Sequence, residues 1–371
     1  IYSKKLNFKK TIWLHGSSVG EILSVIPVIH ELEKNKKIKK ILLSSSTTSS
    51  ALIFSKYKFK KTTHIYFPID TNYLTNKFID YWKPKIAIFI DSEIWPNMFN
   101  NLKKNNIPII LINGRISKKS FKRWIRFPSF ARKIFRRISL ALPQNNETLK
   151  YLKILGVKKI KFLGNLKYYG QSKKILDENT KQGFKNRLIF CAASTHYNEE
   201  LFIGKLHNEL KSKFKNLLTI IIPRHVNRSV SIINELKGIN LNSVSRSSRQ
   251  KISKDTDIYI ADTYGEASKF YKLSKITFVG GSLIKHGGQN PLEPARLGNY
   301  ILHGPNIQNF KEVYKMLSEL NISSKVNNIN NMKKIIFRKI EYKQTSKKIK
   351  KLNLIGNDIL KKNLVEINKF L

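Results

Sequence analysis

The chain has 371 residues, of which 41% are hydrophobic and 11% aromatic, with only 17 glycines and 11 prolines. This composition excludes a disordered chain, and the length exceeds a single hydrophobic core, so we expect about two globular domains. Cys191 is the only cysteine, which excludes an internal disulfide framework and fits a reducing compartment.

The net charge is +46, from 70 Lys and Arg against 24 Asp and Glu. Such a charge favours polyanionic partners: nucleic acid, an anionic membrane or a phosphorylated substrate. Lysine is frequent throughout, as in proteins from genomes of skewed base composition, so charge alone does not choose among these functions. No run of ~18 apolar residues is present, and the chain opens at Ile1 on a basic segment, which leaves room for an upstream targeting or anchoring segment.

Short runs of β-branched and aliphatic residues alternate with amphipathic segments, such as Glu21 to Leu32 and Tyr73 to Trp82, through the first half. Because the runs are apolar at successive positions, helices should cover both faces of a parallel, doubly wound α/β sheet. The expected strands are Thr11 to His15, Ile41 to Ser46, His64 to Phe67, Ile86 to Asp91 and Ile107 to Asn113.

The alternation pauses in a polar stretch, Gly170 to Asn186, and then resumes, which predicts two similar α/β domains facing each other across a cleft. Met332 to Leu371 has a helical pattern with a turn signal only near Gly356, and we expect it to pack back on the interface. The predicted organisation is a domain at 1–168, a linker at 169–186, a domain at 187–345 and a final helix at 346–371. The expected strands of the second half are Leu188 to Ala193, Leu217 to Ile222, Ile258 to Ala261, Ile276 to Val279 and Tyr300 to His303.

Two loops of the first half place a glutamate directly after a strand. The first is HGSSVGE, residues 15–21, where small residues precede a helix whose backbone N–H groups suit an anion. Glu21 is either an ordinary first-turn carboxylate or a catalytic one. The second loop is IDSEIWPN, residues 90–97, where Pro96 opens a helix, Asp91 or Ser92 is a candidate cap, and Glu93 is a second candidate catalytic carboxylate. Both loops should open onto one face of the sheet.

Four loops of the second half also follow strands: AASTHYNEE at 192–200, IIPRHVNR at 221–228, ADTYGE at 261–266 and GGSLIKHGGQNPLEP at 280–294. Their cations, helix starts and glycines suit a phosphate-bearing ligand, although turns and solvated charges explain each loop taken singly.

The segment Arg115 to Arg137 interleaves cations with aromatics, so it fits an anionic membrane surface, single-stranded nucleic acid, or helices with core aromatics broken at Pro128.

Other site types lack their motifs in this sequence. The histidines stand singly and Cys191 lies inside an expected strand, so no metal site or thiol nucleophile is predicted. The sequence has neither GxxxxGK[ST] nor GxGxxG after the first strand, so the usual NTPase and nicotinamide-enzyme signatures are missing.

The sequence contains, in this order, the motifs HGSSVGE, DSEIWPN, NGRIS, GNLK, AASTH, PRH, DTYGE, and GGS followed by GGQNPLEP. Their order and approximate spacing resemble those of the 3-deoxy-D-manno-octulosonic acid (Kdo) transferases. The resemblance runs from about Trp13 to Phe310. It implies a GT-B fold of two Rossmann-like domains, an N-terminal one for the acceptor and a C-terminal one for the nucleotide sugar. It also implies inverting, metal-independent transfer of Kdo from CMP-Kdo to the lipid A precursor lipid IVA, with no cofactor, at the cytoplasmic face of the inner membrane.

By the same resemblance Glu21 is the general base and Glu93 a second catalytic carboxylate. A helix start lowers the basicity of a carboxylate, so burial or a nearby negative charge must offset it at Glu21. The residues expected to bind CMP-Kdo are Lys167, Ser194, Thr195, Arg224, His225, Gly265, Glu266, Gly280, Gly281, Ser282, Gly287, Gly288, Asn290 and Glu293. Those expected to bind the acceptor are Ser18, Gly20, Arg115, Arg123 and Arg126.

The sequence departs from the family pattern at two places, with Gln289 where a histidine is usual and Tyr168-Tyr169-Gly170 where an aspartate often follows the GNLK lysine. These departures put fine donor contacts in doubt and leave the reaction class intact. Two alternatives stay open at this stage: a GT-B enzyme using another nucleotide sugar, and a non-enzymatic polyanion or nucleic-acid binder. We expect an anionic membrane surface and no nucleic acid as partner, and the sequence does not set the oligomeric state.

Overall fold

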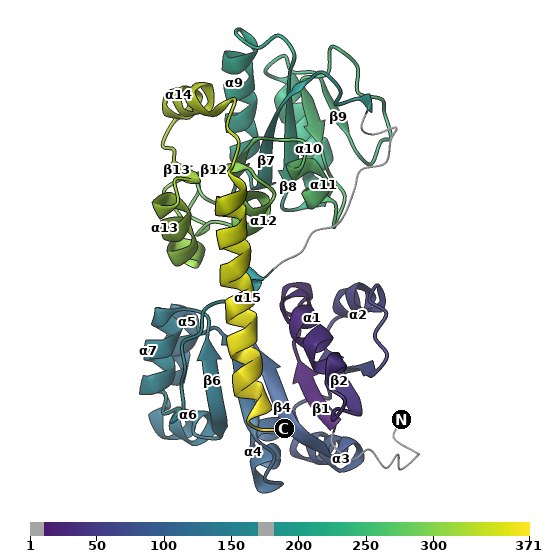
Figure 1. The fold of residues 1–371 in the computed structure, drawn as a ribbon, viewed down its shortest axis with the longest axis vertical. Helices are drawn as coiled ribbons and strands as arrows, with labels where there is room; N and C mark the ends of the chain where they lie inside the picture. The colour runs from purple at the N-terminus through teal and green to yellow at the C-terminus, as the bar shows by residue number, and fades with distance from the viewer. Residues whose placement is uncertain (1–10, 170–181) are drawn as a thin grey trace. The chain divides into compact units, whose positions relative to one another are not determined.

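The structure, a computed structural model, describes residues 11–169 and 182–371 and contains two compact units (Figure 1). The first unit comprises Ile1–Tyr169 together with Leu354–Leu371, and the second comprises Gly170–Asn353. Most of the segment expected as a linker, 169–186, lies outside the described residues.

A six-stranded sheet with the order β3-β2-β1-β4-β5-β6 forms the centre of the first unit, and all its strand pairs are parallel. This is the strand order of a Rossmann domain, in which successive strands are added in one direction from β1 and in the opposite direction from β4. The strands are β1 (Thr11–His15), β2 (Lys40–Ser45), β3 (Thr62–Tyr66), β4 (Pro84–Ile90), β5 (Ile109–Gly114) and β6 (Ile138–Pro143).

Helices cover both faces of this sheet, because its strands carry apolar side chains on both. One core cluster joins the sheet to α1, α2 and the end of α15, and the other joins it to α3, α4, α6 and α7. The helices are α1 (Val19–Lys34), α2 (Thr48–Ser55), α3 (Asn72–Trp82), α4 (Pro96–Lys104), α5 (Lys118–Trp124), α6 (Pro128–Phe135) and α7 (Asn146–Ile154), followed by the 3₁₀ turn η1 (Leu166–Tyr168).

The second unit has a seven-stranded parallel sheet with the order β13-β12-β11-β7-β8-β10-β9. The direction in which strands are added to this sheet reverses between β7 and β11. The strands are β7 (Leu188–Thr195), β8 (Leu217–Pro223), β9 (Ser243–Ser245), β10 (Ile258–Ile260), β11 (Ile276–Val279), β12 (Tyr300–His303) and β13 (Ser323–Lys325).

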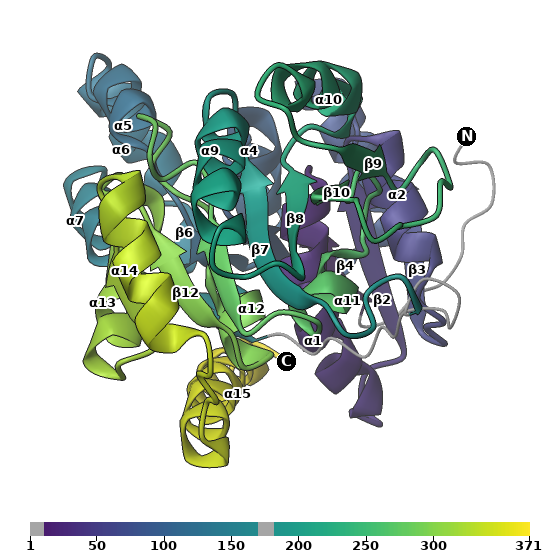
Figure 2. The same ribbon diagram turned by 90° about the horizontal axis from the view of Figure 1, so that it is seen from above.

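Helices also cover both faces of the second sheet. Figure 2 shows α9 and α10 on one side of β7 and β8 and α11 on the other, and each side has its own apolar cluster. The helices are α9 (Glu199–Lys211), α10 (Ser229–Lys237), α11 (Ala267–Tyr271), α12 (Leu292–Arg296), α13 (Lys311–Glu319) and α14 (Ile329–Lys339), with 3₁₀ turns η2 (Val226–Arg228) and η3 (Gln308–Phe310).

The last helix, α15 (Ser346–Asn368), ends on the first unit. Ile359, Leu360 and Ile367 join the buried cluster of that unit, and Glu366 pairs with Lys161 at 2.9 Å. Gly356, the turn signal noted in this segment, lies inside α15. The helical pattern breaks instead between α14 and α15, where the hydroxyl of Thr345 accepts the backbone N–H of Lys348 at 3.4 Å and so caps the new helix.

All ten strands expected from the sequence are present, each within two residues of its predicted ends. Pro96 opens a helix as predicted, and Pro128 gives the predicted break, since it separates α5 from α6. The expected cap at Asp91 or Ser92 was wrong, since the N-cap of α4 is Trp95, and the carboxylate of Asp70 accepts the first N–H groups of that helix instead.

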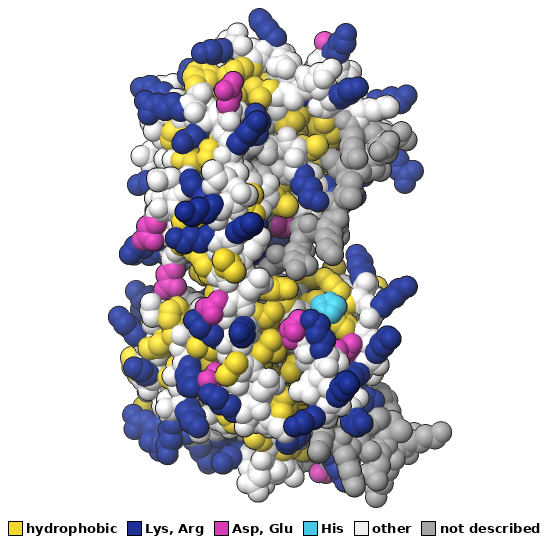
Figure 3. All heavy atoms as spheres, in the orientation of Figure 1, with side chains coloured by type: hydrophobic (Ala, Val, Ile, Leu, Met, Phe, Trp, Pro, Cys, Tyr) yellow, Lys and Arg dark blue, Asp and Glu magenta, His cyan; other side chains and the backbone are white. Residues whose placement is uncertain are grey.

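The positive charge is spread over the surface of each unit. Figure 3 shows Lys and Arg side chains across the whole visible face, with few acidic side chains among them. Among the residues that the structure describes, no helix is both long enough and apolar enough to cross a membrane.

Candidate active site

Each sheet has one point where the strand order reverses, and ligands of open α/β sheets bind at the carboxyl ends of the strands there. In the first unit the loops after β1 and β4 meet at this point, and they carry Glu21 and Glu93. In the second unit the ends of β7 and β11 meet at the equivalent point, with Ser194 at the end of β7 and the glycine stretch that starts at Gly280 after β11.

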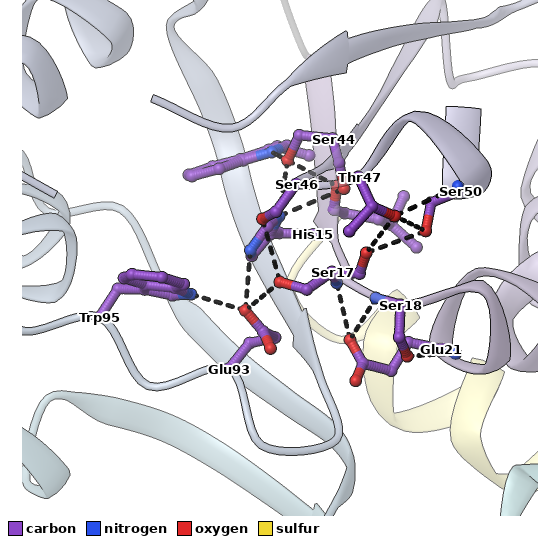
Figure 4. Close-up of polar contacts among 12 residues, drawn as sticks. His15, Ser17, Ser18, Glu21, Ser44, Ser46, Thr47, Ser50, Glu93 and Trp95 are labelled. Atoms are coloured by element: carbon purple, nitrogen blue, oxygen red, sulfur yellow. Dashed lines mark hydrogen bonds and ion pairs between the residues drawn. The ribbon is translucent and has the colours of Figure 1, made fainter. Parts of the chain in front are cut away.

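Glu21 is the third residue of α1 and is held by the loop before the helix (Figure 4). Ser18 is the N-cap: its hydroxyl accepts the backbone N–H of Glu21 at 3.3 Å, which completes a capping box. Oε2 of Glu21 accepts the backbone N–H of Ser17 at 2.7 Å and of Ser18 at 3.3 Å. The ordinary helix-capping role of Glu21 is therefore present, and it leaves the carboxylate fixed at the switch point.

Glu93 is held by three side-chain donors, all on Oε2 (Figure 4). They are Nε2 of His15 at 3.0 Å, the hydroxyl of Ser17 at 2.7 Å and Nε1 of Trp95 at 2.8 Å. Ser17 thus contacts both glutamates, through its backbone N–H and its hydroxyl. The two loops open at one place, as their positions after β1 and β4 predicted.

His15 links Glu93 to the interior of the sheet. Burial lowers the pKa of His15 although Glu93 pulls it upward, so the buried ring is neutral near pH 7. Nδ1 lies 3.0 Å from the hydroxyl of Ser44, which in turn accepts Nε1–H of Trp13 at 2.8 Å. An anionic neighbour at Nε2 favours the tautomer with the proton there, so His15 donates to Glu93 and accepts from Ser44.

The surroundings push the pKa values of the two glutamates apart. Burial raises the pKa of Glu21, and the charges of Glu93 and Asp91 raise it further. The hydrogen bond from the backbone N–H of Ser17 lowers this pKa, but by less. Burial also raises the pKa of Glu93, but the side-chain hydrogen bonds from His15, Ser17 and Trp95 lower it overall. Two carboxylates separated in this way can serve as a proton acceptor and a permanent anion.

Lys167 belongs to the same cluster. Its Nζ lies 3.1 Å from Oδ2 of the buried Asp91, directly after β4. The GNLK segment is seated on the sheet because Oδ1 of Asn113 accepts the backbone N–H of Leu166 at 3.0 Å. The sequence placed Lys167 at the boundary between the halves, and the structure places it beside the carboxylates of the first unit.

The expected acceptor residues are at the surface of the first unit. Ser18 and Gly20 are exposed at the start of α1, and the backbone N–H of Arg115 donates to the carbonyl of Asp91 at 2.9 Å. Arg123 and Arg126 are exposed in and after α5. The side chains that accompany these two arginines are also solvent-accessible: Ile125 is 42% exposed, Phe127 70% and Phe130 50%.

The loops of the second unit bring three histidines together that stand apart in the sequence. His196 lies 4.2 Å from His286 and 5.9 Å from His225, measured between ring centroids. Burial, with the neighbouring cations, lowers the pKa of His196 to about 4. Arg224 and His225 are exposed after β8, next to this group. A buried neutral ring beside an exposed arginine suits a ligand that carries negative charge and hydroxyl groups.

The remaining expected donor residues lie around these loops. Ser194 has a left-handed φ of 55°, and Thr195 is buried at the end of β7. Positive φ values occur at Gly265, Gly281, Gly287 and Gly288, and Gly280 and Ser282 are buried beside them. Asn290 caps the backbone N–H of Leu292 at 3.1 Å, and Glu293 is exposed in the first turn of α12.

The carboxylate of Glu266 is bound by neighbouring side chains of the second unit. Burial raises its pKa, but Lys269, Thr263 and Arg246 bind the carboxylate and lower the pKa to about 2. Nε of Arg246 lies 3.3 Å from Oε2 of Glu266. In this arrangement Glu266 braces the loop after β10.

Sequence reasoning missed four residues of these sites: His15, Ser17, Ser44 and Glu199. His15 and Ser17 stand inside the HGSSVGE motif, and a histidine at the end of a buried strand was a signal that a polar partner was needed. Glu199 also carried a signal, because acidic residues are scarce in this chain and two of them follow β7. Within the described ranges, no three His, Cys, Asp or Glu side chains are grouped so as to hold a metal ion.

Comparisons with known proteins agree with this organisation. A family described as "3-Deoxy-D-manno-octulosonic-acid transferase (kdotransferase)" matches residues 1–169. A 3-deoxy-D-manno-octulosonic acid transferase of Rickettsia typhi is 35% identical over 320 residues, which is 85% of this chain and 69% of that protein. The protein of the same name from Haemophilus influenzae is 30% identical over 367 residues, 97% of this chain and 85% of that one.

The fold has a matching relative among solved structures. A glycosyltransferase of Rickettsia africae aligns with a TM-score of 0.66 at 13% identity and covers 98% of both chains. With two parallel-sheet α/β units, this likeness shows the GT-B fold that the sequence predicted. The chain therefore belongs to the 3-deoxy-D-manno-octulosonic acid transferase family, the glycosyltransferases that add Kdo in lipopolysaccharide biosynthesis.

Proposed function

We propose that this protein transfers Kdo from CMP-Kdo to lipid IVA with inversion at the anomeric carbon, and that Glu21 is the general base. The observation that carries this proposal is the pair of carboxylates at the switch point of the first unit, one with a raised and one with a lowered pKa. A base that must accept a proton near neutral pH is helped by a raised pKa, and a second fixed anion nearby keeps it raised.

Glu21 takes the proton from the attacking hydroxyl of the acceptor. As the O–H bond breaks, that oxygen forms a bond to the anomeric carbon of Kdo from the face opposite the phosphate. The bond between the anomeric carbon and the phosphate oxygen breaks, and CMP leaves with the electron pair. The backbone N–H groups of Ser17 and Ser18 hold Oε2 of Glu21, so the carboxylate stays aligned while it accepts the proton.

Glu93 stays ionised and orients the acceptor. Its Oε2 is held by His15, Ser17 and Trp95, so it cannot rotate away from the loop that carries Glu21. Ser18 and Gly20 at the exposed start of α1 complete the acceptor surface in this proposal.

The second unit binds the donor. CMP-Kdo carries a phosphate and a carboxylate, which call for cations, and its ribose hydroxyls call for a carboxylate acceptor. Exposed Arg224 supplies a cation, exposed His225 supplies a hydrogen-bonding group, and exposed Glu293 supplies the carboxylate. These groups of the second unit stabilise the charge that develops on the departing CMP. In this proposal no metal or other cofactor takes part, since CMP-Kdo is itself a substrate.

The protein acts at the cytoplasmic face of the inner membrane in this proposal. Exposed Ile125, Phe127 and Phe130 lie among exposed Arg123 and Arg126 on the first unit. Aromatic side chains settle at the depth of lipid headgroups while arginines contact anionic lipid, so this surface brings the enzyme to its lipid acceptor.

The test is transfer of Kdo from CMP-Kdo to lipid IVA in detergent, followed by mass spectrometry of the product. Glu21→Gln should lower kcat by about 10²- to 10⁴-fold, the usual contribution of a positioned base. Glu31→Gln, on the same helix and paired with Lys34 at the surface, is the matched control and should retain wild-type turnover. Nearly full turnover by Glu21→Gln, with unchanged substrate affinity, would remove Glu21 as the base.

Two additions to this assay test the donor and the metal requirement. CMP should compete with CMP-Kdo, and UDP should not, which separates this activity from that of a GT-B enzyme for another nucleotide sugar. Turnover should also survive EDTA.

A further inference from the structure

Glu199, the first residue of α9, is buried and accepts four backbone N–H groups. Its Oε2 lies 3.0 Å from the N of His196 and 2.7 Å from the N of Gly281. Its Oε1 lies 3.0 Å from the N of Ser282 and 3.0 Å from the N of Leu283. Both oxygens are therefore shared between two loops of the second unit.

This pattern goes beyond a helix cap. A first-turn glutamate ordinarily caps its own helix start, as Glu21 does in α1. Three of the four bonds of Glu199 instead cross to residues more than 80 positions later, in the loop after β11. That loop and the start of α9 flank the switch point of the second sheet, so Glu199 joins the two sides of the predicted donor site.

The glycines of this loop fit the carboxylate. A Cβ on Gly280 would lie 2.8 Å from Oε2 of Glu199 and 2.5 Å from the carbonyl oxygen of Ser194, closer than real Cβ atoms come. Gly281 has φ +64°, a conformation that L side chains rarely adopt. Bare backbone at these positions lets the loop close around a side chain of the protein itself.

The outer part of the glycine stretch depends on the part that Glu199 holds. The carbonyl of Gly281 accepts the N–H of Gly288 at 2.7 Å, and the carbonyl of Ser282 accepts the N–H of Asn306 at 2.9 Å. Moving residues 281–283 would therefore move Gly288 and the residues around it.

We infer that Glu199 is a positioning residue for donor binding, which sets the conformation of residues 281–283 by accepting their backbone N–H groups. This inference rests on the proposed function, in which that loop contacts CMP-Kdo. It assigns the N–H groups of Gly281, Ser282 and Leu283 to the protein's own carboxylate, so the phosphate of the donor is bound by other groups.

The neighbouring glutamate holds a different loop. Glu200 is fully buried, and its Oε1 lies 2.9 Å from Nη1 of Arg228, whose guanidinium lies over the ring of Tyr197. Glu200 thus anchors the end of the loop that begins at Arg224, while Glu199 anchors the glycine stretch.

The decisive variant is Glu199→Gln. An amide offers one acceptor oxygen, so its NH₂ group must face two of the four backbone N–H groups that the carboxylate accepts. Hydrogen exchange at residues 281–283 should become about tenfold faster or more, because a hydrogen bond to a charged group contributes more than a neutral one. Glu209→Gln removes a carboxylate that is 53% exposed on the same helix and should leave this exchange unchanged.

The kinetic test compares the KM values of the two substrates. The KM for CMP-Kdo should rise by about tenfold or more in Glu199→Gln, while the KM for lipid IVA stays at the wild-type value, since only donor binding depends on the loop. A general loss of folding would not produce this split, and the melting temperature checks for it. An unchanged donor KM in a variant with fast exchange at 281–283 would overturn the inference.

A measurement on the wild-type protein keeps the inference testable if the variant does not fold. The N–H groups of Gly281, Ser282 and Leu283 should already be protected from exchange without CMP, because Glu199 accepts them in the free protein. Ready exchange without CMP, or protection that appears only with CMP, would overturn the role of Glu199. A wild-type protein that shows protected N–H groups but neither binds CMP nor uses CMP-Kdo would refute the proposed function instead.

Discussion

The hydroxyl of Ser17 donates to Oε2 of Glu93 across 2.7 Å, while the backbone N–H of Ser17 donates to Glu21 across the same distance. One residue therefore fixes two carboxylates whose pKa values are shifted in opposite directions. Because each carboxylate acts on the other through its charge, changing one should change the titration of the other.

Glu93→Gln should move the acidic limb of the pH profile of kcat/KM to lower pH. The limb reports deprotonation of Glu21, whose pKa is raised by burial and then by the negative charge of Glu93. A neutral amide removes that charge, so Glu21 gives up its proton more readily. The measurement is kcat/KM for lipid IVA against pH, and an acidic limb that stays in place would show that Glu21 does not control it.

Lys167→Met should move the same limb the other way. Lys167 neutralises Asp91, and the charge of Asp91 raises the pKa of Glu21. Without the ammonium group the negative potential at Glu21 grows, so activity should appear only at higher pH, whatever the loss in kcat. Lys34→Met, on an exposed pair of α1, is the control and should leave the limb in place.

Glu21→Gln should be more stable than the wild type at neutral pH. Since folding raises the pKa of Glu21, its stabilising contribution is full below the unfolded pKa and is lost as the pH rises through the folded pKa. A glutamine avoids this loss and still accepts the N–H groups of Ser17 and Ser18. The difference in Tm between variant and wild type should increase as the pH rises from about 4 to 7. A constant difference would contradict the assigned shift.

Trp95→Phe should lower the free energy of unfolding by about 1.5–3 kcal/mol, the usual contribution of a hydrogen bond to a charged group. The substitution keeps an aromatic ring beside Phe67 but removes the N–H that donates to Glu93 at 2.8 Å. Urea unfolding gives the free energy. The pKa of Glu93 should rise as well, because one of the donors that lower it is gone.

Phe127→Ser combined with Phe130→Ser should weaken binding to vesicles that contain phosphatidylglycerol by about tenfold or more, since burial of each aromatic side chain is worth ~1.5–3 kcal/mol. Both side chains are at least half exposed, so the folded state should be little affected. Val230→Ser, which changes an exposed apolar residue of the second unit, should bind vesicles like the wild type. Equal binding by all three proteins would exclude this surface as the membrane contact.

Most of the fold was readable from the sequence because its strands are long, apolar and separated by helical patterns. Strands β9 (Ser243–Ser245) and β13 (Ser323–Lys325) were not predicted, since three residues of serine, valine and lysine carry no strand signal and pair only because a neighbouring strand is already placed. β6 (Ile138–Pro143) was also missed, although its sequence is apolar.

The candidate sites were predictable in part, for a similar reason. Position after a strand was enough to bring Glu21 and Glu93 to one place. It could not show that Ser17 joins them, that His15 donates to Glu93, or that Glu199 reaches residues more than 80 positions away. Such hydrogen bonds depend on distances between loops, which no local pattern in the sequence encodes.

The attachment of α15 to the first unit bears on how the chain folds during synthesis. Ile359, Leu360 and Ile367 complete a core that begins with Ile12 and Leu14, so this core cannot close until α15 has left the ribosome. Domains usually fold as units from the N-terminus while translation proceeds. Here the second unit can fold first, and part of the apolar surface of the first unit stays uncovered until α15 has been synthesised.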